Sequence, residues 1–404
     1  MDFGFNAEQQ KFIAEIREFC ATTPKGDLAD PADVPDDARF NFSFSFYQKV
    51  CDKGWAGLTF PEEYGGRGLG STFQVIFNEQ MQSQGAAISV TSVGNNNWLG
   101  SIIAKHGTER QKQEYLARIC RGEIILLCQS FTEPDAGADL ASVKTRAVRD
   151  GDDYVINGQK MFSSNAHLNG RTTRLLLLAR TDTDSPPEKG ISMFLIPPDL
   201  PGITIRPLWT DGGGRTNEIF FDNVRVSRDS LLGEESGLNR GWDYFREFEW
   251  GDWERAPGVF YVVFREMLKK LIDFVKTTRM DGRLLSQEPS VRRKIAEIAT
   301  GIEIVRLLGY KMAWAQDEGG DVLGAAAVES LVRDSLAVQF PNLALCILGP
   351  YGQLQSGSKY AVLNGMLEEM YRLNAFCLFG LVGPLTRKNF IAHHLLGLPQ
   401  YHGY

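Results

Sequence analysis

Apolar residues recur at helical spacing in the first part of this 404-residue chain. In AEQQKFIAEIREFC, four apolar positions fall on one face of a predicted helix: Phe12, Ile13, Ile16 and Phe19. Asn6 stands where an N-cap residue is expected. The segment GTERQKQEYLARI (107–119) shows a second helical pattern. We therefore expect an α-helical domain over residues 1–125.

The pattern changes to short apolar or alternating runs between about residues 126 and 235. These runs are RLLLLARTD, ISMFLIP, GITIRPL and NEIFFDNVRV, and DGDD, SPPEKG, DLPG and DGGG interrupt them. Apolar runs separated by Gly, Pro and Asp predict β-strands joined by turns. DGGGRTNE is expected to be a hairpin turn rather than a nucleotide loop, because a strand follows it. The region is predicted to form a small β-barrel or sandwich.

Long helical patterns return in the last part of the chain. In VRRKIAEIATGIEIVRLLGYKMAWAQ, one stripe is apolar: Ile295, Ile298, Ile302, Val305 and Leu308. Several such helices with short connections predict an antiparallel bundle over residues 236–404. The fold class is therefore α+β, with an N-terminal helical domain, a central β domain and a C-terminal helical bundle.

Composition narrows the classes of partner. The formal net charge is -7, which argues against a nucleic-acid partner because phosphates require a basic face. The six cysteines are scattered without a CxxC pair, so reduced thiols are expected. MDFGFNAEQQ has no signal-peptide pattern, and no uninterrupted apolar stretch approaches the roughly 18 residues that span a bilayer. We expect a cytoplasmic protein without membrane insertion.

The segment CQSFTEPDAGADLASVKTRAVRDGDDYVINGQKMFSSNAHLNG (128–170) is the most specific feature of the sequence. It places small and hydroxyl-bearing residues at two corners of the predicted β domain. Such residues let the backbone approach closely and can hydrogen-bond the rim of a planar heterocycle. By contrast, His393 and His394 have no partner at metal-ligand spacing, so no metal site is expected.

FTEPDAGADLASVKT followed by VINGQKMFSSNA resembles the flavin-binding signature of the acyl-CoA dehydrogenase family. Further elements follow in the same order as in that family: HGTERQKQEYL, GISMFLIP, PGITIRPL, TNEIFFDNVRV, LLGEE, NRGW and LLGLP. The resemblance covers most of the chain. It implies an N-terminal helical domain, a central β-barrel and a C-terminal four-helix bundle. It also implies FAD, bound between the subunits of a dimer or tetramer.

The resemblance assigns flavin contacts residue by residue. Thr132 matches the threonine that touches the flavin ring, and Ser164 matches the threonine that hydrogen-bonds near flavin N5. Phe162 takes the place of the tryptophan that shields that face of the ring. Ala138 replaces a serine, which removes a hydrogen bond with a net worth of about 1 kcal/mol. Arg279 matches the arginine that reaches the FAD phosphate across the dimer interface.

The resemblance leaves two places for the general base. Many members carry a glutamate in the C-terminal loop, but Leu381 occupies that position here and cannot take a proton. Other members place the glutamate on a bundle helix, where this sequence has Glu254 followed by Arg255. We predict that Glu254 is the base, that Arg255 lies near the thioester or CoA, and that Trp253 shapes the acyl pocket. Leu381 could still donate its backbone N–H to the substrate carbonyl. An ordinary surface Glu–Arg pair is the alternative reading of this dipeptide.

The C-terminal FAD elements depart from the family pattern. In CILGPYG (346–352), Cys346 and Pro350 replace a glutamine and a glycine, whereas Gly349 is kept. FGLVGPLTRKNFIAHHLLGLP (379–399) combines glycines with a basic helix start, an arrangement that can bind phosphate. Three residues there could replace the lost contacts to the adenosine and pyrophosphate of FAD: Thr386, Arg387 and Lys388.

The sequence therefore predicts an FAD-dependent acyl-CoA dehydrogenase that forms an α,β-double bond in a branched, long or bulky acyl-CoA. The base removes the α-proton, the β-hydride passes to flavin N5, and an electron-transfer flavoprotein is the expected acceptor. Either a homo-oligomer or a hetero-oligomer with a second acyl-CoA dehydrogenase subunit is possible. The alternatives are a flavin monooxygenase on the same fold and a non-catalytic partner subunit.

Overall fold

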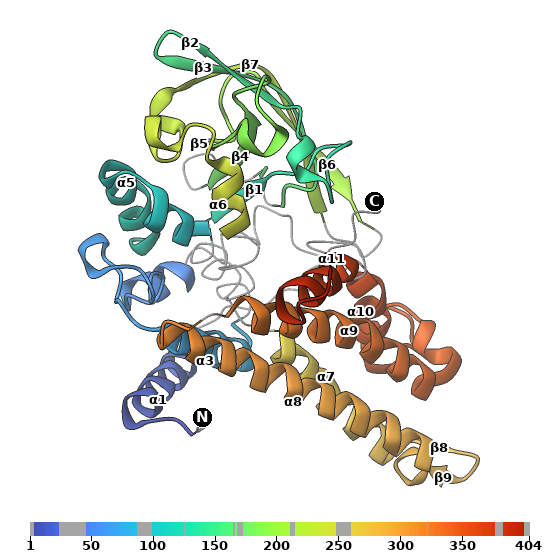
Figure 1. Ribbon diagram of the computed structural model, residues 1–404. Helices are drawn as coiled ribbons and strands as arrows, with labels where there is room; N and C mark the ends of the chain where they lie inside the picture. The colour runs from blue at the N-terminus through green and yellow to red at the C-terminus, as the bar shows by residue number, and fades with distance from the viewer. Residues whose placement is uncertain are drawn as a thin grey trace. The chain divides into compact units, whose positions relative to one another are not determined.

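The computed structural model describes residues 4–23, 46–86, 99–124, 126–164, 166–167, 173–210, 215–247, 260–320, 322–375 and 383–399. The chain divides into two compact units. One is built mainly from Phe5–Thr210 with Arg215–Ala256, and the other mainly from Pro257–Tyr404. The helix–sheet–helix order predicted from the sequence is confirmed (Figure 1).

Helices with capping boxes open the first unit. Its helices are α1 (Ala7–Thr22), α3 (Ser71–Ser83), α5 (Glu109–Cys120), α6 (Gly241–Glu247) and the stretches 46–52 and 99–106. Asn6 caps α1 as predicted, because its side chain accepts the N–H of Gln9 at 2.9 Å. Thr108 caps α5 in the same way. The predicted apolar face of α1 is buried.

A strongly curled seven-stranded sheet lies between α5 and α6 in sequence. Its strands are β1 (Leu126–Ser130), β2 (Arg146–Asp150), β3 (Asp153–Lys160), β4 (Thr173–Arg180), β5 (Ile191–Ile196), β6 (Ile203–Trp209) and β7 (Arg215–Ser227). The strand order is β1-β4-β2-β3-β7-β6, and β5 pairs with β4. β6 and β7 pair antiparallel on either side of the DGGG stretch, which lies outside the described residues. β1 runs parallel to β4 and belongs to the same sheet as β3. The two predicted corners lie at the ends of β1 and β3.

The leucine run of β4 is buried on both faces of the sheet. Leu175 and Leu177 belong to the core enclosed by the sheet, together with Phe194 of β5. Leu176 and Leu178 point to the other face and pack in a core with residues of the N-terminal helices. Because successive side chains of a strand alternate between faces, an uninterrupted apolar run is what a strand buried on both sides requires.

The second unit is helical. Its main elements are α7 (Phe260–Thr277), the hairpin β8 (Arg279–Met280) and β9 (Arg283–Leu284), α8 (Pro289–Asp317), α9 (Leu323–Leu348), α10 (Met366–Asn374) and α11 (Pro384–Phe390). The predicted stripe of α8 faces its core, with Ile298, Ile302 and Val305 fully buried. α9 packs between α8, α10 and α11 (Figure 1).

α9 is the one helix among the described residues that is long and apolar enough, by length and composition, to cross a membrane. Half of its most apolar window is buried, and three charged residues of this helix are also buried: Glu329, Arg333 and Asp334. These features are typical of a core helix.

Candidate functional site

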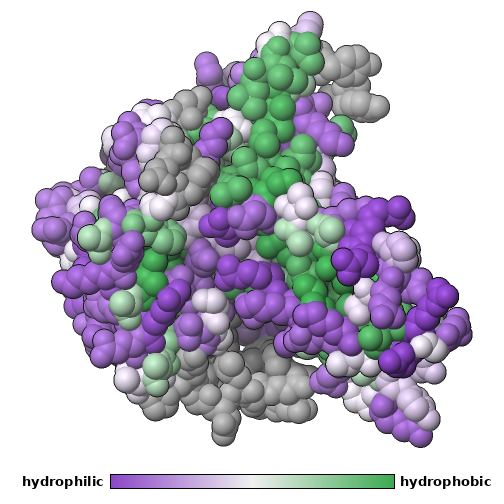
Figure 2. Space-filling view, turned by 90° about the horizontal axis from the view of Figure 1, so that it is seen from below, coloured by the Kyte–Doolittle hydropathy of each residue, from purple (hydrophilic) through white to green (hydrophobic). Residues whose placement is uncertain are grey.

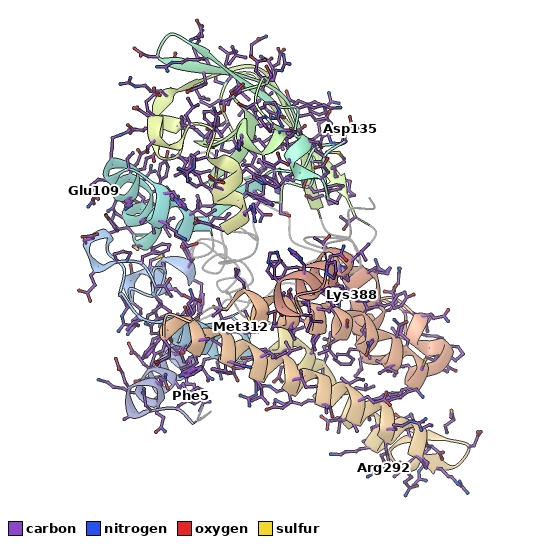
Figure 3. The ribbon with its side chains drawn as sticks, in the orientation of Figure 1. Phe5, Glu109, Asp135, Arg292, Met312 and Lys388 are labelled. Carbon is purple, nitrogen blue, oxygen red and sulfur yellow. The ribbon has the colours of Figure 1, made fainter. Side chains whose placement is uncertain are left out.

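The two corners singled out in the sequence are hydrogen-bonded to each other. One corner follows β1 at Phe131–Glu133, close to Asp135 in Figure 3, and the other follows β3 at Met161–Ser164. The N–H of Met161 donates to the carbonyl of Thr132 at 2.8 Å. The hydroxyls of Ser130 and Ser163 are 3.3 Å apart in the buried layer below. The structure therefore brings the positions 132 and 162–164 together.

Phe162 has a strained and exposed conformation. Its φ is 59°, in the left-handed region that a bulky residue seldom adopts. Its side chain is 61% exposed, although large aromatic side chains are usually mostly buried. Strain of this kind persists where the surrounding structure enforces it, and it concentrates at functional sites. The exposed ring is available to cover a planar ligand.

A buried asparagine fixes the second corner from below. The side chain of Asn217, on β7, donates to the carbonyl of Ser163 at 2.8 Å and lies 3.2 Å from Nδ1 of His167. The carbonyl of Asn217 accepts the N–H of Ser163 at 3.0 Å. These two hydrogen bonds leave Ser164, the next residue, exposed at the surface.

An ion pair between Lys160 and Glu133 is buried between the two corners. The Lys160 side chain is 0% exposed, and its Nζ donates to Glu133 Oε1 and to the carbonyl of Phe131, each at 2.8 Å. Glu133 also accepts the backbone N–H groups of Lys144 at 2.6 Å and Thr145 at 2.9 Å. One carboxylate thus joins three segments of the sheet domain.

The pKa values of this pair follow from burial and charge. Burial lowers the pKa of Lys160 to about 8, although the charge of Glu133 opposes this shift. Burial alone would raise the pKa of Glu133, but the charge of Lys160 and the donated hydrogen bonds hold it below its ordinary value. At neutral pH both groups are therefore charged and paired.

Gly158 allows β3 to pack closely against Thr145, the residue that precedes β2. Its φ of 149° is rare for residues with a side chain, and a Cβ there would lie 2.7 Å from the Cα of Thr145. The register of β3 against β7 shifts at this residue. The glycine of the NGQK motif is therefore required for close approach, just before the strand reaches Lys160.

The corners have the features that a flavin ring needs. Thr132 is half-buried, while Ala138 and Ser164 are exposed, so two hydroxyls and a small residue border an accessible surface. A Cβ added at Gly137 would meet no atom within 4 Å, which leaves room above the first corner. Hydroxyl donors beside an exposed ring at Phe162 fit the edge and face of an isoalloxazine.

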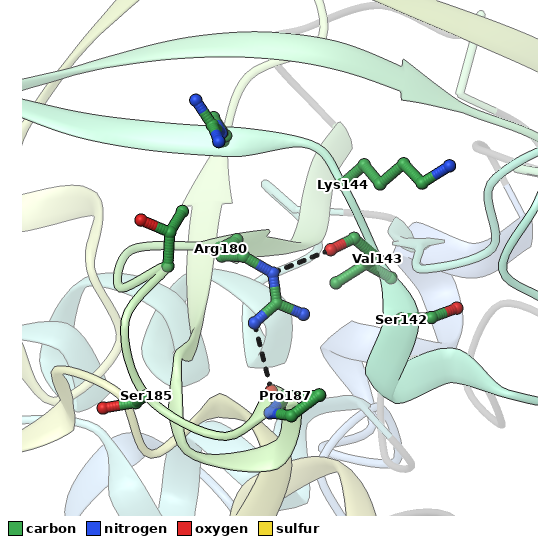
Figure 4. Close-up of a pocket in the computed structure, with 8 residues that line it drawn as sticks. Ser142, Val143, Lys144, Arg180, Ser185 and Pro187 are labelled. Atoms are coloured by element: carbon green, nitrogen blue, oxygen red, sulfur yellow. Dashed lines mark hydrogen bonds between the residues drawn. The ribbon is translucent and has the colours of Figure 1, made fainter.

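A basic pocket of about 460 Å³ lies next to the first corner (Figure 4). Its lining residues come from two loops of the sheet: Ser142, Val143, Lys144, Arg146, Arg180, Thr183, Ser185 and Pro187. Arg180 shapes the pocket, because its guanidinium donates to the carbonyls of Ala141, Val143 and Pro187 at 2.6, 3.0 and 3.2 Å. Lys144 and Arg146 extend from the same loop, and Lys144 forms a 3.0 Å surface ion pair with Asp135. Cations and hydroxyls together favour an anion.

The predicted C-terminal and hairpin residues lie in the helical unit. Gly349 ends α9 with a φ of 62°, and Thr386 and Lys388 are exposed on α11 (Figure 3). Arg387 is 0% exposed, and its Nη1 is ion-paired with Asp334 of α9. Arg279 is exposed on the β8–β9 hairpin and donates to the carbonyl of Gly282 at 2.8 Å. Their roles toward FAD stay predictions.

Four predicted residues lie outside the described residues: Trp253, Glu254, Arg255 and Leu381. The described part of α6 ends at Glu247, before the first three of them. That carboxylate is fixed by Lys105 at 2.7 Å and by Nε2 of His106 at 2.8 Å. The imidazole of His106 stacks on Tyr244 with ring centroids 4.1 Å apart. α6 is thus anchored to the N-terminal helices.

Comparison with known sequence families is consistent with the geometry of the corners. The N-terminal, middle and C-terminal domain profiles of acyl-CoA dehydrogenases match residues 6–123, 128–224 and 239–373. The chain belongs to the acyl-CoA dehydrogenase family. An acyl-CoA dehydrogenase is an FAD-dependent oxidoreductase, so the predicted enzyme class, fold and cofactor are confirmed.

Relatives of this acyl-CoA dehydrogenase match it over nearly its full length. The acyl-CoA dehydrogenase FadE26 of Mycobacterium tuberculosis is 29% identical, and the match covers 99% of both chains. A chain of the ChsE4-ChsE5 complex of Mycobacterium tuberculosis is 26% identical with a TM-score of 0.84, covering 99% of this chain and all of that one. A chain of the Tcur3481-Tcur3483 steroid ACAD is 28% identical with a TM-score of 0.80 and the same coverage.

Two groups of site residues were missed from the sequence. Glu133 and Lys160 stand inside the quoted motif, but nothing in their spacing of 27 residues shows that they pair. In the sequence, Lys144 and Arg146 are ordinary polar residues at the start of a strand. Only the folded structure places residues 180–187 beside them. The signal that could have pointed to the pair is a glutamate directly after Thr132 and a lysine two residues before Phe162, both close in sequence to predicted flavin contacts.

Proposed function

We propose that this acyl-CoA dehydrogenase oxidises branched, long or bulky cyclic acyl-CoA thioesters to their α,β-unsaturated forms. The observation that supports it best is the joined pair of corners, where Thr132, Ser164 and the exposed ring of Phe162 border one accessible surface. The bulky substrate is supported by the similarity to a chain of the Tcur3481-Tcur3483 steroid ACAD. When bound, FAD supplies the acceptor for the β-hydride.

Glu254 is the proposed general base that takes the α-proton of the thioester. The reaction requires a carboxylate that takes the α-proton. The position of the loop glutamate is occupied by Leu381, whose side chain cannot accept a proton, so the carboxylate must come from another part of the chain. The backbone N–H of Leu381 would polarise the thioester carbonyl. Arg255 would lie near the thioester or CoA, and Trp253 would line the acyl pocket.

The basic pocket at Lys144 and Arg146 is proposed to bind a phosphate of CoA. The pocket lies on the loop that follows the first corner, and its lining combines three cationic residues, one of them Arg180, with the hydroxyls of Ser142, Thr183 and Ser185. Ionic hydrogen bonds of this kind contribute about 1.5–3 kcal/mol each. Arg180 keeps the two loops in place through its bonds to three carbonyls.

A panel of thioesters tests the proposed reaction. Straight-chain, branched and alicyclic acyl-CoA substrates are mixed anaerobically with the FAD-loaded protein, and bleaching of the yellow colour is followed. Bleaching with matching enoyl-CoA formation, fastest for branched or alicyclic substrates, supports the proposal. In a parallel aerobic assay, oxygen consumption with a hydroxylated product would instead identify a monooxygenase. Reoxidation by a purified electron-transfer flavoprotein tests the proposed acceptor.

A role as one subunit of a hetero-oligomer is the second candidate. It is supported by the changed C-terminal elements, Cys346 and Pro350, and by the similarity to chains of the ChsE4-ChsE5 complex. Size-exclusion chromatography of the chain expressed alone, with flavin counted per chain, separates the possibilities. One FAD per chain in a dimer or tetramer favours a homo-oligomer. A colourless chain that turns yellow only when a second acyl-CoA dehydrogenase subunit is co-expressed favours the hetero-oligomer.

A further inference from the structure

The buried ion pair between Lys160 and Glu133 needs a reason other than stability. Removing two charges from water is costly, and well-packed apolar residues are often as stabilising as a buried pair. Both side chains are almost inaccessible, at 0% and 6% exposure. The pair nevertheless occupies the space between the two corners, where an apolar filling would be the simpler solution.

The hydrogen bonds of Lys160 hold the residues on either side of Thr132. The carbonyl before it, on Phe131, accepts from Lys160 Nζ, and the residue after it, Glu133, accepts from the same nitrogen. The carbonyl of Thr132 itself accepts from Met161, the residue that follows Lys160. Three consecutive residues are thus held by two consecutive residues of the other corner.

The same carboxylate continues to the basic pocket. Its Oε2 accepts the N–H of Lys144 at 2.6 Å, and Oε1 accepts the N–H of Thr145 at 2.9 Å. The side chain of Lys144 lines the pocket. A change at Glu133 would therefore disturb the backbone at both places, whereas a change at Lys160 acts directly on the first corner alone.

We propose that Lys160 and Glu133 are positioning residues, which preset the Thr132 corner for the flavin and join it to the anion pocket at Lys144. The proposal rests on the proposed flavin and phosphate sites. In this proposal, neither side chain contacts the flavin or the phosphate. The charge of Arg180 also lowers the pKa of Lys160. Arg180 itself is held by the carbonyls of Ala141, Val143 and Pro187.

Flavin release from the full-length, FAD-loaded protein tests the first half of the proposal. Variants Lys160→Met, Lys160→Arg and Glu133→Gln are diluted in series, and released flavin is measured by its fluorescence. Lys160→Met should raise the dissociation constant at least tenfold and alter the visible band of the remaining bound flavin. Lys160→Arg should restore part of the affinity. Arg225→Met, which removes an exposed ion-paired cation of the same sheet, should match the wild type.

The double variant Lys160→Met with Glu133→Gln guards against a simple failure to fold. It leaves no unpaired buried charge, so its melting temperature should exceed that of Lys160→Met, while flavin affinity stays low. If the double variant recovered both stability and flavin affinity, the pair would be structural only and the proposal would be overturned. Wild-type affinity with an unchanged flavin spectrum in Lys160→Met would overturn it as well.

Substrate kinetics test the link to the pocket. Glu133→Gln should raise KM for an acyl-CoA several-fold more than KM for the corresponding acyl-pantetheine, which has no phosphate. Lys160→Met should raise both by the same factor. Equal effects of Glu133→Gln on the two substrates would refute the link.

One further variant separates this inference from the flavin site on which it depends. Thr132→Val removes the hydroxyl assigned to the flavin ring. If Thr132→Val weakens flavin binding while Lys160→Met does not, the site stands and the positioning role fails. If neither variant weakens it, the flavin site itself is wrongly assigned.

Discussion

The β corners and the C-terminal helix α11 keep different parts of the family pattern. The corners retain hydroxyls at Thr132 and Ser164, and a buried ion pair and an asparagine hold their backbone. α11 forms the expected helix, but its one buried cation, Arg387, is directed into the helical unit at Asp334. Leucines are exposed on α11 and just after it: Leu385, Leu395, Leu396 and Leu398. On the face drawn in Figure 2, hydrophobic residues also reach the surface between hydrophilic ones.

The difference shows how a fold can keep a site in one region while the side chains of another region change. A corner that must match the edge of a rigid ring depends on backbone positions, and many buried hydrogen bonds fix those positions. A helix that lies over a bundle needs only a partner for its buried groups and an apolar face. The following predictions test whether function follows the same division.

The largest effect is expected for Glu254→Gln. General base catalysis contributes about 10²–10⁴-fold, so turnover should fall by that factor while flavin content stays at the wild-type level. Stopped-flow bleaching with a good acyl-CoA substrate measures it. Glu266→Gln, an exposed glutamate of α7 paired with Lys269, should keep wild-type turnover. Full turnover in Glu254→Gln would place the base elsewhere.

The next effect concerns the buried charges of α9 and α11. Arg387→Met leaves Asp334 as a buried carboxylate that has lost one of its cations, and breaking such a pair costs about 3–5 kcal/mol. Urea unfolding of the FAD-loaded protein measures the loss of unfolding free energy. Lys269→Met, at an exposed pair, should change it by less than about 1 kcal/mol.

A double variant in the same cluster tests whether Arg387 also contacts FAD. The variant Arg387→Met with Asp334→Asn removes both charges, so much of the stability should return. Flavin affinity measured in this variant then reports on Arg387 alone. Unchanged affinity limits Arg387 to the helical unit, and a loss of tenfold or more supports the predicted contact with the pyrophosphate.

The sequence predicted the elements better than the contacts between them. Helical spacing identified the buried face of α1 and its cap at Asn6, and the leucine run identified β4, because these signals are local. The pairing of Arg387 with Asp334 joins residues 53 positions apart, and an arginine in a basic first turn reads as solvated. The left-handed backbone of Phe162 is also invisible in the sequence, since nothing in the identity of a phenylalanine favours it.

A smaller effect is expected in the basic pocket. Lys144→Ala with Arg146→Ala should raise KM for an acyl-CoA about 10- to 100-fold, which corresponds to a combined loss of about 1.5–3 kcal/mol at this solvent-accessible site. The corresponding acyl-pantetheine should keep its KM, because it carries no phosphate. Lys189→Ala, at an exposed position of the neighbouring loop, is the matched control. Equal losses for both substrates would show that the pocket does not bind the phosphate.

The smallest effect is the acid response of the corner. Because the pKa of Glu133 is lower in the folded chain than its ordinary value of 4.5, its carboxylate stabilises the fold above that value. This contribution disappears as the pH falls below 4.5 and through the folded pKa, since the unfolded chain takes up the proton first. Unfolding free energies measured in urea between pH 6 and about pH 3.5 should therefore fall more steeply in the wild type than in Glu133→Gln. Parallel curves would mean that Glu133 keeps its ordinary pKa, so that its ionisation adds nothing to the stability of the corner.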